Sequence, residues 1–293
     1  MSWWVIGLAR RAVSAKVSVM STPVTLPPVL LLHGFLGAPE DWDAVCHAWQ
    51  PSQPVYAYSG IQPFGYAQGP PFERPQGSPK PFEIKEKYAT EPSGKIWDTI
   101  LKNILAYMDQ RNSDDAWDIV GYSMGGRIAW MLAYYYPHRV RRLCILSANP
   151  GLSSPDERQL RALKDQEWAD CLRTEGMVTF LHRWYAQPLF ASFRQHALFS
   201  SIVAKRADED SAMQAMIVTS LSPAYQPDLW SWVLSSQIPT LYLSGDSDVR
   251  YTEIGHRLSV NQAIRHETIP GAGHVLHLEA PAHVAEVLQR FLT

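Results

Sequence analysis

Residues 120–127 read VGYSMGGR, and this stretch decides the fold. An apolar run at 117–120 leads into it and predicts a buried strand, while the apolar residues of 128–135 follow at helical spacing. A strand, Gly-x-Ser-x-Gly and a helix in succession form the pattern of a nucleophile elbow, in which a serine occupies a sharp turn and exposes its hydroxyl. The alternative interpretation is a glycine-rich strand-to-helix turn with an incidental serine.

The neighbours of Ser123 suit a reactive turn. Glycines flank the Tyr-Ser-Met core of the motif, and larger side chains there would clash with the strand and the helix. The helix that begins after Ser123 also points its amide groups at any negative charge that forms beside the hydroxyl. Ser123 is therefore the first candidate for a chemical role.

The bulk composition limits the class of protein. A chain of 293 residues suits one large α/β domain, alone or with a lid. The hydrophobic fraction of 46%, which includes 11 tryptophans and 13 tyrosines, is enough for a packed core. A net charge of −2 argues against a nucleic-acid-binding surface. No stretch approaches the length of a membrane-spanning helix, so we expect no membrane span.

The number of cysteines and the composition of residues 1–20 indicate the cellular compartment of the protein. The three cysteines form no Cys-x-x-Cys pair, and an odd number suits a reducing compartment better than a disulfide framework, so we expect a cytoplasmic protein. Residues 1–20 contain Arg and Lys but no acidic residue, which is reminiscent of a targeting peptide. They lack the continuous apolar segment of a secretory signal. We expect them to form a poorly ordered extension.

Apolar runs of strand length alternate with stretches of helical spacing along most of the chain, which predicts an α/β fold. Between 155 and 232 the strand signal vanishes, and helical spacing with Trp and Arg dominates. The stretch 60–95 is rich in Pro, Gly and Gln without a period and is interpreted as an irregular insertion. Strands are expected at 29–32, 53–58, 117–120, 140–147, 239–245 and 266–269, and helices at 96–108 and 284–291.

These elements predict a mostly parallel, doubly wound sheet with an inserted helical cap. The core is expected to consist of residues 21–148 and 236–293, and the cap of residues 149–235. The extension at 1–20 precedes the core, and the insertion at 60–95 interrupts its first part.

An acid and a histidine follow Ser123 in the order that completes a catalytic triad. Asp248 follows a late strand in the pattern Gly-x-x-Asp and is the preferred acid, with Asp246 as the second choice. His274 lies in a glycine-rich loop after the last strand and is the expected base. A serine hydroxyl needs an imidazole to take its proton, and the imidazole needs a buried carboxylate to fix its tautomer. Serine, acid and histidine in this order are typical of the α/β-hydrolase fold, which we therefore expect.

Two more histidines follow the expected base. His277 and His283 lie on the following helical segment and are expected to be surface residues. The pair of His274 and His277 could suggest a metal site, but no carboxylate accompanies it at metal-binding spacing, so no metal is expected.

The sequence His-Gly-Phe-Leu-Gly at 33–37 ends the first expected strand. In hydrolases of this type such a turn lies beside the nucleophile and donates a backbone amide to an oxyanion. We expect the amides of Phe35 and Met124 to form that pair. The alternative is a tight turn between a strand and a helix.

Arginines of the elbow helix and of the expected cap could face one cleft. Arg127 lies one helical turn beyond Ser123, while Arg161 and Arg206 lie in the cap. Guanidinium groups suit the bidentate binding of carboxylates. For each arginine alone, a solvated surface position is the competing interpretation.

Several motifs together resemble a known family. The sequence Gly-Tyr-Ser-Met-Gly-Gly-Arg is followed by Asn-Pro-Gly-Leu at 149–152, by Glu-Arg at 157–158 with Arg161, and by Trp-Tyr-Ala-Gln-Pro-Leu-Phe at 184–190. From about residue 28 to the C-terminus, the chain resembles the MenH-type 2-succinyl-6-hydroxy-2,4-cyclohexadiene-1-carboxylate synthases of menaquinone and phylloquinone biosynthesis. The segment at 184–190 is the most distinctive part of the resemblance.

The resemblance implies a lyase that eliminates pyruvate without hydrolysis. Ser123, Asp248 and His274 would remove a ring proton next to the succinyl ketone, and the amides of Phe35 and Met124 would hold the enolate oxygen. Further family positions imply contacts with a polycarboxylate substrate, with no cofactor. The carboxylate-binding positions match Arg127, Arg161 and Arg206, with Lys205 as an alternative to Arg206, and the pocket-lining positions match Tyr122, Trp184 and Tyr185.

One departure from the family concerns the turn after the second strand, where members usually carry an Asp-x-x-Gly-His-Gly-like sequence. Here Ala-Tyr-Ser-Gly at 57–60 and the Pro-rich insertion stand in its place.

A serine hydrolase acting on an ester or a carbon–carbon bond is the second hypothesis for the function, and a non-catalytic binding protein is the third. The protein is expected to be a monomer or a weak homo-oligomer.

Overall fold

A computed structural model describes residues 26–60, 93–111 and 116–293. The expected extension at 1–20 and nearly all of the expected insertion at 60–95 lie outside these residues, so their structure stays a prediction. In the described part of the chain, no helix is both long enough and apolar enough to cross a membrane.

The described residues contain a sheet of six strands in the order β2-β1-β3-β4-β5-β6, and every neighbouring pair is parallel. This confirms the predicted α/β class with a parallel sheet. The strands coincide with the expected apolar runs to within a few residues. Their bounds are β1 Val29–Leu32, β2 Val55–Tyr58, β3 Trp117–Tyr122, β4 Val140–Leu146, β5 Thr240–Gly245 and β6 Ile264–Ile269.

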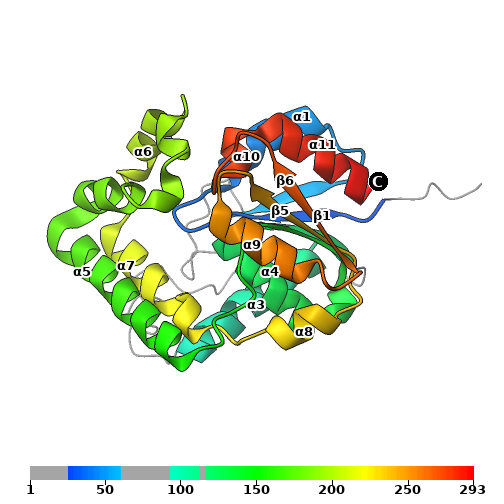
Figure 1. The fold of residues 1–293 in the computed structure, drawn as a ribbon, viewed down its shortest axis with the longest axis horizontal. Helices are drawn as coiled ribbons and strands as arrows, with labels where there is room; N and C mark the ends of the chain where they lie inside the picture. The colour runs from blue at the N-terminus through cyan, green and yellow to red at the C-terminus, as the bar shows by residue number, and fades with distance from the viewer. Residues whose placement is uncertain (1–25, 61–92, 112–115) are drawn as a thin grey trace, which may run out of the picture.

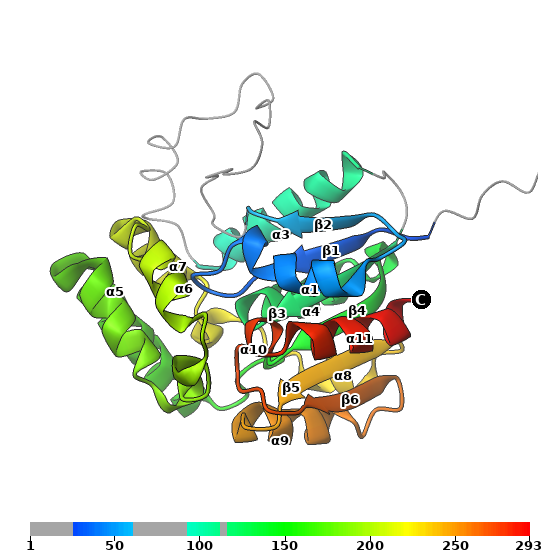
Figure 2. The ribbon, with the colours of Figure 1, turned by 90° about the horizontal axis from the view of Figure 1, so that it is seen from above.

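Helices cover both faces of the sheet, which is why its central strands are continuous apolar runs. In β1, Val29 and Leu31 face one apolar cluster, while Leu30 and Leu32 face the other. Figures 1 and 2 show the two helical layers on opposite sides of the strands. One layer is formed by α1 (Asp43–Trp49) and α11 (Pro281–Leu292), and the other by α3 (Ser93–Asp109), α4 (Met124–Tyr135), α8 (Trp230–Ser235) and α9 (Val249–Leu258).

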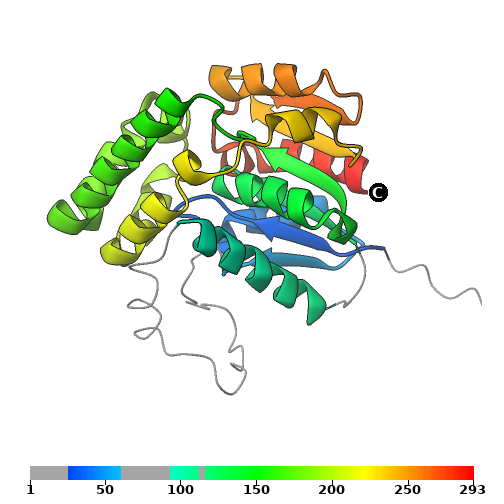
Figure 3. The same ribbon diagram turned by 90° about the horizontal axis from the view of Figure 1, so that it is seen from below.

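A helical cap lies beyond the carboxyl ends of the strands (Figure 3). Its long helix α5 bends at Gly176, whose φ of 79° is incompatible with a regular helix. Trp230 and Val233 of α8 pack in the same apolar cluster as α3 and α4, so α8 lies against the sheet. The cap elements are α5 (Pro155–Tyr185), η3 (Pro188–Phe190), η4 (Phe193–Gln195), α6 (Phe199–Arg206), α7 (Ser211–Ser220) and η5 (Pro223–Tyr225).

The strand order explains where a site forms. The chain passes from β1 to β2 on one side and then crosses to β3 on the other, so β1 and β3 are neighbours at the point where the order reverses. In open α/β sheets, ligands bind outside the carboxyl ends of the strands at such a point. The two loops that leave β1 and β3 carry the His-Gly-Phe turn and the Gly-x-Ser-x-Gly motif.

Candidate active site

Ser123 lies between β3 and α4 in a strained backbone conformation. Its φ is 50° and its ψ is −109°, and its amide donates to the carbonyl of Leu146 at 2.9 Å. The turn is tight enough to require glycine beside it, because a Cβ on Gly121 would approach the carbonyl oxygen of Gly125 to 2.5 Å. A serine held at a positive φ by its surroundings is a typical device of reactive sites. The predicted elbow is therefore present.

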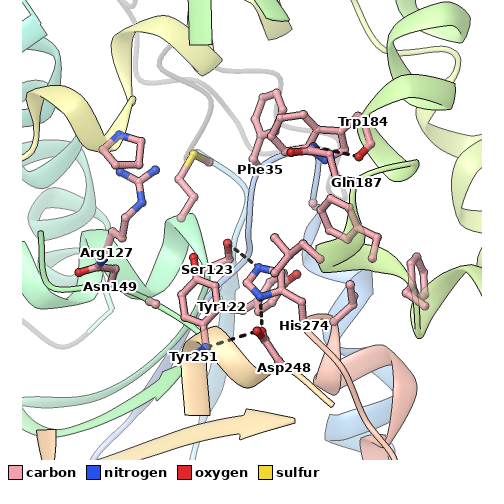
Figure 4. Close-up of a pocket in the computed structure, with 18 of the residues that line it drawn as sticks. Phe35, Tyr122, Ser123, Arg127, Asn149, Trp184, Gln187, Asp248, Tyr251 and His274 are labelled. Atoms are coloured by element: carbon pink, nitrogen blue, oxygen red, sulfur yellow. Dashed lines mark hydrogen bonds and ion pairs between the residues drawn. The ribbon is translucent and has the colours of Figure 1, made fainter. Parts of the chain in front are cut away.

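His274 bridges Ser123 and Asp248. Its Nε2 lies 3.3 Å from Oγ of Ser123, and its Nδ1 lies 2.8 Å from Oδ2 of Asp248 (Figure 4). The imidazole and the carboxylate are both buried. With Nδ1–H donating to the carboxylate, Nε2 is left as the acceptor that faces the hydroxyl. The structure thus brings the three residues predicted for the triad into hydrogen-bonding reach.

Asp248 also begins helix α9. Its Oδ1 accepts a hydrogen bond from the amide of Tyr251 at 3.4 Å, which orients the carboxylate toward His274. The second-choice acid, Asp246, is exposed and accepts a hydrogen bond from the amide of Gly271 at 3.0 Å instead. The geometry therefore favours Asp248 as the partner of His274.

The turn after β1 lies against the elbow. A Cβ placed on Gly34 would be 3.5 Å from Cβ of Ser123 and closer still to the ring of Tyr122. Within the described residues, neither the amide of Phe35 nor that of Met124 donates a hydrogen bond to another group. Both residues line the same cavity as Ser123. The two amides are thus available for an oxyanion, although this role stays a prediction.

A cavity of about 630 Å³ opens above Ser123, between the strand ends and the cap. This volume lies within the range of small-molecule sites. Among the described residues, more basic than acidic side chains line the cavity, so it favours an anionic ligand. The basic ones are Arg127, Arg161, Lys164, Arg206 and Arg250, and the acidic ones are Asp41, Asp165 and Asp248.

Arg206 enters the cavity from helix α6. Its Nη2 donates to Oδ2 of Asp41 at 2.7 Å, and its Nη1 donates to the hydroxyl of Tyr185 at 3.4 Å. Burial works against the charge, yet Tyr185 and Asp41 raise the pKa of Arg206 above its ordinary value. The neighbouring Lys205 is exposed and does not line the cavity. The structure therefore favours Arg206 over Lys205 as the cationic residue of this wall.

Arg161 lies on α5 with about a third of its side chain exposed. Its Nε donates to Oδ2 of the buried Asp165 at 2.7 Å. Because this bond uses Nε, the two terminal nitrogens of the guanidinium remain for a ligand.

Arg127 differs from the other two arginines because its hydrogen-bonding partners are neutral. It donates to the carbonyl of Leu221 at 2.8 Å and to Oε1 of Gln226 at 3.2 Å, so its side chain extends away from Ser123 toward the cap (Figure 4). Burial, with a smaller effect from the charge of Arg161, lowers the pKa of Arg127 to about 10. It is still charged at neutral pH. A ligand carboxylate beside it would neutralise a costly buried charge.

Aromatic residues of both the cap and the core line the cavity around the triad. Trp184 is half-buried, stacks on Phe180 at 5.4 Å between ring centroids, and meets the edge of Phe35 at 5.2 Å. Tyr185 and Tyr122 are buried and also line the cavity. The structure therefore gathers all three residues predicted to line the pocket.

The expectation that His277 is a surface residue is wrong, whereas His283 is exposed as expected. His277 lies on the short helix α10 (Leu276–Glu279), which turns inward, and its ring packs at 4.2 Å from that of Tyr122 and at 4.9 Å from that of Trp42. Burial lowers the pKa of His277 to about 3, so the ring is neutral. Neither ring nitrogen has a hydrogen-bonding partner among the described residues.

Three polar residues escaped the sequence reasoning, because each is identified only by a partner that lies far along the chain or one helical turn away. Asp41 and Asp165 line the cavity, and Gln226 is buried outside its lining. Asp41 pairs with Arg206 across 165 residues, and Gln226 accepts from Arg127 across 99. Asp165 lies four residues after Arg161, at the spacing of a helical ion pair, and this spacing could have identified it.

The sequence of this chain is similar to those of known proteins. Residues 27–281 match the model of the α/β hydrolase fold family. The chain is 30% identical over 268 residues to the 2-succinyl-6-hydroxy-2,4-cyclohexadiene-1-carboxylate synthase of Shigella dysenteriae, with 91% of this chain and 94% of the relative covered. It is also 30% identical over 275 residues to the Protein PHYLLO, chloroplastic, of Arabidopsis thaliana.

The extent of these matches differs. The match to PHYLLO covers 90% of this chain but 15% of that protein. The match to the putative 2-succinyl-6-hydroxy-2,4-cyclohexadiene-1-carboxylate synthase of Bacillus subtilis, at 33% identity, covers 60% of this chain and 65% of the relative.

Solved structures share the fold. The structure of MenH from S. aureus superposes with a TM-score of 0.78 at 22% identity and covers 92% of this chain and 94% of that one. A thermophilic esterase from Thermogutta terrifontis gives a TM-score of 0.71 at 21% identity, covering 92% and 90%. At such identities the likeness establishes the fold, and an esterase and MenH share it.

Proposed function

This chain belongs to the α/β hydrolase fold family and, within it, to the 2-succinyl-6-hydroxy-2,4-cyclohexadiene-1-carboxylate synthases, and on that premise we propose that it is a pyruvate-eliminating lyase. Its substrate is 2-succinyl-5-enolpyruvyl-6-hydroxy-3-cyclohexene-1-carboxylate, and its product is the 2,4-cyclohexadiene of menaquinone and phylloquinone biosynthesis. The observation that carries the proposal is a Ser–His–Asp triad that opens into a cavity with an excess of basic side chains.

The reaction begins with removal of the ring proton at C2, which is acidified by the adjacent succinyl ketone. His274 takes this proton through the hydroxyl of Ser123, and Asp248 stabilises the imidazolium that forms. The electron pair of the C2–H bond moves onto the ketone oxygen. The amide of Phe35, in the turn after β1, and the amide of Met124, at the start of helix α4, stabilise this enolate.

The second step expels the leaving group. When the ketone reforms, a double bond forms between C2 and C3, the ring double bond moves to C4 and C5, and the bond from C5 to the enolpyruvyl oxygen breaks. The proton held by His274 neutralises the departing enolpyruvate, which becomes pyruvate. No water takes part, so the cap serves to exclude water from the enolate.

The arginines of the cavity bind the carboxylates of the substrate, which lie on its ring, its succinyl group and its enolpyruvyl group. Arg127, Arg161 and Arg206 line the cavity from three different helices, α4, α5 and α6. Fixed guanidinium groups at separate points both bind and orient such a ligand. An esterase pocket for an apolar acyl chain would not need them.

The proposal is tested by measuring pyruvate release from the enolpyruvyl cyclohexene substrate with lactate dehydrogenase as the coupling enzyme. Hydrolysis of a nitrophenyl ester is followed in parallel. We expect substrate-dependent pyruvate release that far exceeds ester hydrolysis. Ester hydrolysis without pyruvate release would assign the triad to an ordinary serine hydrolase instead.

We also propose that the protein acts in the cytoplasm as a monomer or weak homo-oligomer. Its three cysteines are unpaired, which suits a reducing compartment, and one chain supplies the triad and the arginines. Light scattering after size-exclusion chromatography measures the oligomeric state, and a mass corresponding to a stable higher oligomer contradicts the proposal. Fluorescent tagging of the full chain tests its location, since the relative PHYLLO is described as chloroplastic.

A further inference from the structure

A single carboxylate binds the backbone on both sides of His274. Glu279 is the last residue of α10, and its Oε2 accepts a hydrogen bond from the amide of Gly273 at 3.0 Å. Its Oε1 accepts one from the amide of Val275 at the same distance. The residue before His274 and the residue after it are therefore both held by one side chain, although the loop itself is glycine-rich.

The same carboxylate is bound by the cap. The hydroxyl of Ser192, between η3 and η4, donates to Oε2 of Glu279. A Cβ on Gly273 would lie 2.7 Å from Cβ of Ser192, so the side chain of Ser192 packs closely on the histidine loop at that point. The ring of Phe190 also meets that of His274 edge-on, with 6.0 Å between centroids. The cap thus contacts the loop through two neighbouring residues, Ser192 and Phe190.

We propose that Glu279 is a positioning residue that keeps His274 within reach of Ser123. Through its bond to Ser192 it also couples the position of His274 to the packing of the cap on the core. The inference rests on the proposed role of His274 as the base. The imidazole lies 3.3 Å from the serine hydroxyl, and small displacements of a reacting group are costly. Fixing the amides on both sides of His274 limits the two backbone movements that would lengthen this distance.

The chemistry of the side chain matters as well as its size. A carboxylate offers acceptor oxygens alone, and here it meets two amides and one hydroxyl, which are all donors. In Glu279→Gln the side chain keeps its shape, but one oxygen becomes an NH₂ group that faces a donor. The loop then loses one of its two anchors while its packing is preserved.

The test uses a fluorophosphonate, which reacts with a serine hydroxyl only when a base activates it. We expect Glu279→Gln to slow the labelling of Ser123 by roughly 10- to 100-fold, on the scale of a misplaced reacting group. Ser192→Ala keeps both amide anchors and should slow labelling by less. The matched control is Glu286→Gln, which removes an exposed glutamate that pairs with Arg290 on α11 and should label at the wild-type rate.

A second measurement separates positioning from general stability. The low-field proton resonance of the hydrogen bond between His274 and Asp248 should broaden or move in Glu279→Gln and stay unchanged in Glu286→Gln. With the proposed substrate, kcat should fall while KM stays near its wild-type value, because the arginines are untouched.

Two outcomes overturn the inference. One is a folded Glu279→Gln variant that labels at the wild-type rate with an unchanged low-field resonance. The other applies if Glu279→Gln does not fold: Ser192→Ala then decides, and unchanged labelling rejects the coupling. Labelling does not depend on pyruvate release, so a wild-type protein that labels but releases no pyruvate rejects the proposed function and leaves this inference standing.

Discussion

Asp41 and Arg206 form a buried ion pair in the wall of the cavity, with 2.7 Å between Oδ2 and Nη2. Asp41 belongs to η1 (Pro39–Trp42), just after the turn that leaves β1, and Arg206 ends cap helix α6. The pair therefore joins the cap to the core in the cavity that Phe35 and Met124 also line. It holds the guanidinium in place before any ligand carboxylate arrives, which reduces the ordering cost of binding.

Removing the acid of this pair should destabilise the protein. Asp41→Asn keeps the shape of the side chain but leaves the charge of Arg206 buried without its acidic partner, so we expect the free energy of unfolding to fall by about 3 kcal/mol. Urea denaturation measures this change. The control is Asp170→Asn, which breaks an exposed pair with Arg173 and should cost less than about 1 kcal/mol. Equal effects of the two variants would contradict the buried-pair interpretation.

Arg127→Ala should reduce the binding of the transition state, which lowers kcat/KM. Arg127 is charged, buried and bound by neutral groups, so a substrate carboxylate gains a charged hydrogen bond there. We expect kcat/KM for pyruvate release to fall by an amount equivalent to about 2 kcal/mol. Arg290→Ala, which removes a surface arginine, serves as the control. An unchanged kcat/KM would exclude a carboxylate contact at Arg127.

Ser123→Ala should abolish most turnover. The hydroxyl relays the substrate proton to His274, and loss of a triad member costs about three to six powers of ten in kcat. Pyruvate release under single-turnover conditions measures the loss, and circular dichroism checks that the fold is intact. Ser201→Ala, at an exposed position on α6, should keep full activity. Turnover near the wild-type level in Ser123→Ala would remove this serine from the mechanism.

The burial of His277 predicts a pH dependence of stability. Its pKa falls from 6.5 in the unfolded chain to about 3 in the folded protein, chiefly through burial, with Asp41 opposing and Arg206, His274 and His33 assisting. Between these two values the unfolded state binds more protons, so stability is complete above pH 6.5 and decreases as the pH falls toward 3. The loss amounts to about 5 kcal/mol at most.

His277→Phe tests this pH dependence, because it preserves a ring between Tyr122 and Trp42 without a titrating group. Urea denaturation between pH 7 and pH 4 should give a shallower decline in the variant than in the wild type. Some decline will remain, since burial also lowers the pKa of His33. His283→Gln, at an exposed histidine of α11, should retain the wild-type slope. A wild-type slope in His277→Phe would show that the ring does not titrate as described.

Much of the fold was predictable because its signals are local. The apolar runs of β1 and β3 and the helical spacing after Ser123 identify buried strands and a helix without reference to distant residues. The order of Ser123, Asp248 and His274 then indicates the topology, since each follows a strand at the same edge of a parallel sheet.

The inward turn of α10 was not predictable in this way. Its sequence, Leu-His-Leu-Glu, has too few residues for a periodic signal, and histidine is intermediate between buried and exposed residue types. The ring of His277 becomes buried because Tyr122 and Trp42 arrive from elsewhere in the chain. The roles of Asp41 and Glu279 have the same origin, since their partners lie far along the sequence or across the cap.

The sequence by itself determined the reactive turn, the parallel sheet, the presence of a cap and the identity of the residues that meet at Ser123, because periodicity and glycine placement act within a few residues. Only the tertiary structure decided which acid holds Arg206, which of two adjacent basic residues enters the cavity and which carboxylate holds the loop of His274. Those choices depend on how the cap lies on the core, and this packing brings together groups that no local pattern connects.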